Sequence, residues 1–113
     1  MDRIEIGRIC RALPAATLDH PFGEGHDAWR VGGKMFVMVG EQGGVSFKVS
    51  DIAYEILTET GRARPAPYMA RAKWVNLPDP GAWEADELAE HFAIAHRIVA
   101  GKLTKKARAG LGL

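Results

Sequence analysis

The chain has 113 residues and a mass of 12.3 kDa, with 47% hydrophobic residues, 26% charged residues and a formal net charge of +1. This composition is typical of a soluble globular protein and excludes an intrinsically disordered chain, so we predict one domain over residues 1–113. No segment approaches the ~20 apolar residues of a membrane span, and residues 1–8 lack the apolar core of a signal peptide. We therefore expect a cytoplasmic protein.

The first element is predicted to be a helix that ends before Pro14. Asp2 followed by Glu5 is a capping-box arrangement at its N-terminus. Apolar residues then recur at helical spacing and should form one buried face: Ile6, Ile9, Cys10 and Leu13. Cys10 is the only cysteine, which excludes an intramolecular disulfide, and its place on this face indicates a buried thiol.

Three strands are predicted next, in an antiparallel meander. Residues 27–31 and 34–39 flank Gly32-Gly33, a pair able to adopt the positive φ angles of a tight hairpin turn. Residues 45–49 alternate apolar and polar side chains, so the apolar ones should face the core. The polar side chains that should face the opposite side are Ser46 and Lys48.

The second half of the chain is predicted to contain three helices and a strand. Ser50 is the expected N-cap of a helix over residues 50–61, whose buried stripe should contain Ile52, Ala53, Ile56 and Leu57. A strand is predicted over residues 72–77 and a long helix within residues 81–101. A short helix with only basic polar residues follows over residues 105–111.

Charge is distributed unevenly along the chain. Residues 62–73 contain four bases and no acid, and residues 97–108 contain five bases and no acid. Residues 79–90, between them, contain five acids and no base. Because local potential attracts a polyanion more than net charge does, the two basic segments are candidate contact surfaces.

No metal site or catalytic constellation is predicted. His20, His26 and Asp27 carry side chains that can ligate transition metals, but their spacing matches no metal motif. The only serines, Ser46 and Ser50, lie on a predicted strand and at a helix cap, with no base in reach. We therefore expect no catalytic residue and no cofactor, and an enzyme is the less favoured class of protein.

The strongest cluster of functional side chains combines bases with aromatic rings. It contains Lys34, Lys48, Arg62, Arg64, Tyr68, Arg71, Lys73 and Trp74. Lysine and arginine neutralise phosphates and aromatic faces stack on bases, so this mixture suits DNA. The alternative is that Tyr68 and Trp74 belong to the core or its edge, while the bases only keep the sheet edges soluble. The residues alone favour this alternative over DNA binding.

The order of several motifs resembles that of the MmcQ/YjbR family. These motifs are His20-Pro21-Phe22-Gly23, Gly33-Lys34-Met35-Phe36, Phe47-Lys48, Pro67-Tyr68-Met69 and Lys73-Trp74-Val75. Two positions depart from the family's pattern, since Ala70-Arg71 replaces Asn-Lys and Ala95-His96 replaces Ser-Tyr or Ser-His. The resemblance implies an α+β fold like that of bacterial frataxin homologues, a two-layer sandwich in which helices pack on one face of an antiparallel sheet of about four to six strands.

The resemblance also implies DNA binding. We expect a monomer that binds DNA weakly and largely without sequence preference through Lys34, Lys48, Arg62, Arg64, Arg71, Lys73 and Trp74. Two alternatives stay open. One is a protein-interaction module whose acidic and basic segments meet complementary partners. The other is frataxin-like iron binding, which is less favoured because Arg3, Arg8 and Arg11 surround the acids of the first helix.

Overall fold

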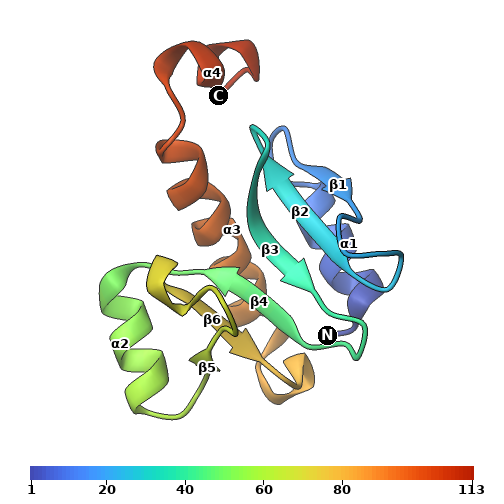
Figure 1. Ribbon diagram of the computed structural model, residues 1–113, viewed down its shortest axis with the longest axis vertical. Helices are drawn as coiled ribbons and strands as arrows, with labels where there is room; N and C mark the ends of the chain where they lie inside the picture. Colours follow the sequence, from blue (N-terminus) through green and yellow to red (C-terminus); the bar gives the residue numbers. More distant parts are fainter.

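Six strands form one antiparallel sheet in the computed structural model, which describes residues 1–113. Their spatial order is β1-β2-β3-β4-β6-β5, and every neighbouring pair is antiparallel. The strands are β1 (Thr17–Asp19), β2 (Asp27–Val31), β3 (Lys34–Val39), β4 (Val45–Lys48), β5 (Arg64–Pro65) and β6 (Trp74–Leu77). Together with the helices they confirm the predicted α+β class (Figure 1).

The four helices are α1 (Arg3–Arg11), α2 (Asp51–Glu59), α3 (Ala85–Gly101) and α4 (Lys105–Gly110), with short 3-10 turns η1 (Ala70–Ala72) and η2 (Pro80–Ala82). Two of the four helices, α1 and α3, cover one face of this sheet (Figure 1). The long helix α3 packs on β2, β3 and β4, and α1 packs on α3. The core lies between these layers, and its largest fully buried side chains are Trp29, Phe36, Phe47, Phe92, Ile6 and Leu88. None of the helices is both long and apolar enough to cross a membrane.

Local signals in the sequence define the β2–β3 hairpin and the helix starts. Gly32 and Gly33 have φ angles of 57° and 79°, which suit a two-residue type I′ turn. The predicted N-caps Asp2 and Ser50 are also confirmed, since the side chain of each accepts a backbone N–H three residues later, and Thr104 caps α4 in the same way. Both strands of the hairpin have the predicted bounds.

The strands β3 and β4 separate at one end. They are paired only from Val37 to Val39 on β3, opposite Val45 to Phe47 on β4. The first half of β3 therefore leaves β4 and continues with β2 toward α4 (Figure 1). As a result, Lys48 at the end of β4 has no partner on β3.

Helix α2 flanks the β5–β6 edge and does not lie over the core. Its close contacts with the sheet are those with β5 and β6. Within its predicted buried stripe only Leu57 is buried, whereas Ile52 is 72% exposed and Ile56 is 55% exposed. The predicted burial of the whole stripe is therefore wrong, because the sheet edge covers too little of the helix.

Candidate functional site

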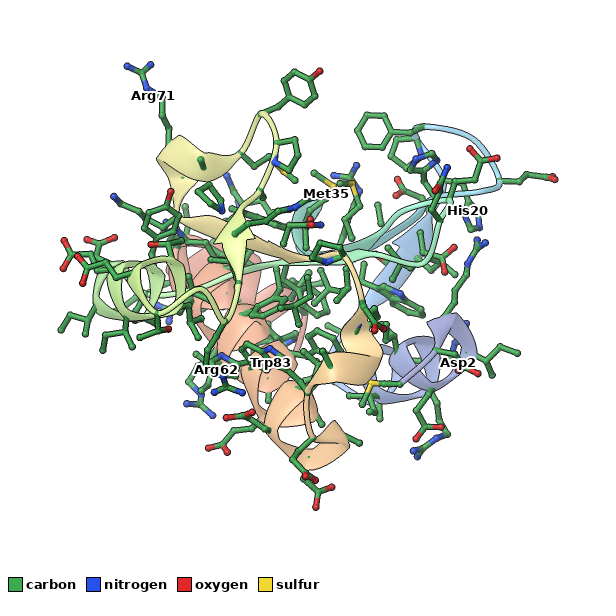
Figure 2. The ribbon with its side chains drawn as sticks, turned by 90° about the horizontal axis from the view of Figure 1, so that it is seen from below. Asp2, His20, Met35, Arg62, Arg71 and Trp83 are labelled. Atoms are coloured by element: carbon green, nitrogen blue, oxygen red, sulfur yellow. The ribbon has the colours of Figure 1, made fainter.

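The face of the sheet opposite α1 and α3 lies between two raised loops (Figure 2). Residues 65–73 form the loop that carries Arg71, and residues 20–26 form the loop that carries His20. Met35 lies between them. This surface, the open face, is built by the two loops and by Met35, Met38, Ser46 and Asn76.

A hollow of about 580 Å³ lies in the open face beside the 65–73 loop. Its floor is a chain of hydrogen bonds in which Arg64 Nε donates to Asn76 Oδ1 over 2.8 Å and Asn76 Nδ2 donates to Ser46 Oγ over 2.9 Å. Both Ser46 and Asn76 are buried, so their polar groups are fixed in place. The polar residues on the other side of the hollow are His26, Glu41 and Gln42.

Tyr68 stands at the rim of this hollow on a strained turn. The N–H of Met69 donates to the carbonyl of Ala66 over 3.2 Å, which places Pro67 second and Tyr68 third in a four-residue turn. Tyr68 has a φ of 67°, a value that a type II turn usually reserves for glycine at this position. Its side chain is fully exposed. The turn thus holds an unpacked aromatic ring in solvent, at a backbone cost of about 1–2 kcal/mol.

Three of the sequence-predicted bases gather around the 65–73 loop. Arg71 is exposed, makes no hydrogen bond or ion pair, and points away from the sheet (Figure 2). Arg64 is also exposed and uses only its Nε within the protein. Lys73 is half-buried, with its Nζ 4.9 Å from the centroid of the Tyr54 ring. These three side chains form the cationic part of the open face.

Two other predicted contacts, Lys48 and Trp74, are buried. They are paired across β4 and β6 and are 7% and 6% exposed. Lys48 Nζ donates to the carbonyl of Ala72, and burial, followed by the nearby charge of Lys102, lowers the pKa of Lys48. The 65–73 loop folds back over this end of β6, where Trp74 N–H donates to the Met69 carbonyl over 3.3 Å. The proposed contact role of Trp74 is therefore corrected to a packing role.

Arg62 lies on the helix side of the sheet, away from Arg71 (Figure 2). Its guanidinium donates to both carboxylate oxygens of Glu87 over 3.0 and 2.7 Å and lies 4.3 Å from the centroid of the Trp83 ring. The pairing with Arg62 lowers the pKa of Glu87. Arg62 thus links the segment before β5 to α3 and lies apart from the open face (Figure 2).

Lys34 is exposed, but it lies at the opposite end of β3 from the hollow. It follows the Gly32-Gly33 turn, close to α4 (Figure 1). The hollow instead adjoins Met38, near the end of the strand. The structure therefore brings together Arg64, Arg71 and Lys73 and leaves Lys34 apart from them.

The histidines before β2 and the first residue of β2, Asp27, form an ion-pair cluster with Arg3. Asp27 accepts a hydrogen bond from Arg3 Nε over 2.7 Å, and this bond lowers the pKa of the Asp27 carboxyl. His20 Nδ1 lies 2.9 Å from the His26 carbonyl and 3.4 Å from Asp27 Oδ1. No group of three or more His, Cys, Asp or Glu side chains is placed to hold a metal ion.

Comparisons with known proteins agree with this architecture. The YjbR family model matches residues 11–98. The chain belongs to the YjbR family. The crystal structure of Deinococcus radiodurans protein DR2400, with a DUF419 domain, is similar to this YjbR protein with a TM-score of 0.88 at 23% sequence identity, over 100% of this chain and 90% of the other. At this identity the likeness shows the fold alone. No curated protein matches the chain.

Some residues that lie in or near the candidate site of this YjbR protein are absent from the sequence-predicted site. Ser46 and Asn76 form the floor of the hollow, and Lys102 approaches Lys48 from the end of α3. Asn76 could have been found from the sequence, because a polar residue inside the apolar strand Trp74–Leu77 needs a hydrogen-bond partner when it is buried. Lys102 carried no such signal, since its distance from Lys48 depends on how α3 crosses the sheet.

Proposed function

We propose that this YjbR protein binds DNA weakly along its open face, without sequence preference and more tightly when the strand is unpaired. The observation that carries the proposal is the fully exposed ring of Tyr68, held on a strained turn beside Arg64 and Arg71. An exposed ring on a strained turn adds nothing to folding, whereas it offers a platform for a base. Only an unpaired base presents its full face to such a ring.

The bases of the 65–73 loop supply the phosphate contacts. Arg71 has no partner within the protein, and the guanidinium of Arg64 keeps its terminal N–H groups free. With Lys73 they provide about three contacts, so the logarithm of the association constant should fall with that of the salt concentration with a slope of about −2. So few contacts support weak, salt-sensitive binding.

The floor of the hollow supports binding without sequence preference. The amide of Asn76 already bonds Arg64 and Ser46, so few of its donors and acceptors are left to read a base edge. Sequence readout requires free groups that match the edges of particular bases. The hollow therefore has room for a base but few free groups that could distinguish one base from another.

A binding titration tests this proposal. A labelled strand of about 20 nucleotides and its duplex are titrated at about 20 and 150 mM salt. The loop variant Arg71→Glu with Lys73→Glu is compared with a control that has the same change in charge, Arg8→Glu with Arg97→Glu, at exposed positions of α1 and α3. We expect the loop variant to lose at least about tenfold in affinity, and the control to bind like the wild type. Absence of binding at low salt, or equal affinities of the two variants, would refute the proposal.

A protein-interaction module is the second candidate, favoured by the exposed apolar residues of α2. Ile52 and Ile56 are one helical turn apart and both lie mostly in solvent. Chemical cross-linking in a lysate should capture a defined protein with the wild type and not with Ile52→Ser combined with Ile56→Ser. Capture of the same proteins by both forms would count against an α2 interface.

A further inference from the structure

Most of the Lys48 side chain is buried, and its ammonium group makes no ion pair with a carboxylate. The side chain is 7% exposed, and its Nζ has one hydrogen-bond acceptor, the carbonyl of Ala72. An ammonium carries three N–H donors, so two of them lack an acceptor in the protein. The ion pairs of the protein involve arginines and one histidine, and no lysine takes part in any of them. Buried charges are normally paired, so this arrangement lacks a negative partner.

Two further lysines converge on the same place. Lys73 lies beside Lys48 across the sheet, because its carbonyl accepts the N–H of Val49 over 3.0 Å. Lys102, at the end of α3, lies close enough that its charge opposes protonation of Lys48. Asp51 is the one carboxylate whose charge favours the protonated form of Lys48. The charges of two further lysines and of one acid thus act on Lys48, at the end of β4 that is not paired with β3.

We propose that Lys48, Lys73 and Lys102 bind a phosphate group. A phosphate oxygen can accept the unused N–H groups of the buried lysine while the two outer lysines close around it. The proposal does not require DNA to be the partner, because an inorganic phosphate, a phosphomonoester or a backbone phosphate would present the same chemistry.

Inorganic phosphate is the probe that tests the site. It is titrated to about 20 mM against chloride at equal ionic strength, and the amide signals of residues 48–52, 73 and 102 are followed by NMR, together with the melting temperature. Lys102→Met is the test variant, because Lys102 is exposed and its loss leaves the core intact. Lys105→Met, at an exposed lysine of α4, is the matched control.

We expect saturable shifts at these amides in the wild type and in Lys105→Met, and about tenfold weaker phosphate binding in Lys102→Met. Absence of saturable shifts at these amides, or equal affinity of the two variants, would overturn the site. A competition arm with a single-stranded oligonucleotide identifies the source of the phosphate. If phosphate displaces the oligonucleotide, the occupant is the DNA backbone. If phosphate binds and the oligonucleotide binds elsewhere or not at all, the ligand of the site is a free phosphate or a phosphomonoester. The DNA proposal then depends only on the titration of the loop variant.

Discussion

Replacement of Tyr68 by glycine should separate the stability of the open face from its binding. Glycine relieves the left-handed strain at φ 67°, worth about 1–2 kcal/mol, but it loses about 0.5–1 kcal/mol more in backbone entropy on folding. The fully exposed ring buries no area, so its removal carries no packing penalty. The net gain of about 0–1.5 kcal/mol should raise the Tm by roughly 0–6 °C for a domain of this size.

The same substitution removes the proposed stacking platform. Stacking of a base on an aromatic ring is worth about 1–3 kcal/mol, so the affinity for a single strand should fall about 5- to 150-fold. Thermal unfolding by circular dichroism and fluorescence anisotropy with a labelled oligonucleotide measure the two effects. Tyr68→Phe keeps both the strain and the ring, and should match the wild type in both assays. A Tm lower by more than about 3 °C in Tyr68→Gly would mean that the ring packs on the fold. Binding as tight as that of Tyr68→Phe would refute the contact.

Buried and paired groups elsewhere provide further tests. Burial lowers the pKa of Lys48 below 10.5, so near this pH the unfolded chain binds more protons than the native protein. The unfolding free energy of the wild type should therefore rise relative to that of Lys48→Met as the pH approaches 10.5. Urea titrations measure both pH profiles, and parallel profiles would contradict this expectation. Arg62→Ala should lower the Tm slightly and leave DNA affinity unchanged, and an affinity loss equal to that of the loop variant would return Arg62 to the binding surface. Burial raises the pKa of the Cys10 thiol to about 12, so the thiol should react with Ellman's reagent at a pH of about 8 only after unfolding; rapid reaction of the native protein would show that it is accessible. Iodide should quench tryptophan emission poorly with or without DNA, and strong quenching would contradict the burial of Trp29, Trp74 and Trp83.

Elements with complete local signals are predictable from this sequence. The β2–β3 hairpin needs only Gly32-Gly33 and two flanking apolar runs, and α2 needs Ser50 at its N-cap. The strands β1 and β5 have three and two residues, too short to show a period. They exist because longer strands, β2 and β6, offer them hydrogen-bond partners.

The candidate site is less predictable, because burial depends on segments that are distant in sequence. Alternation along β4 indicates correctly that Lys48 points away from the core, but the 65–73 loop then covers it, with the Ala72 carbonyl accepting a hydrogen bond from its Nζ. Arg62 and Arg71 belong to one basic run, yet the chain passes through β5 between them and places them on opposite sides of the sheet (Figure 2). The strained turn at Tyr68 is likewise not predictable from the sequence. Pro67 favours a turn, but it does not predict that the non-glycine residue after it has a positive φ.

Amide chemical-shift mapping with a single-stranded oligonucleotide tests the central claim most directly, because it locates binding without any substitution. DNA binding along the open face should shift residues 64–73 together with Met38, Ser46 and Asn76, and the shifts should shrink as salt rises. Shifts confined to α1, α3 or α4, or no shifts at low salt, would contradict the assignment of DNA binding to the open face.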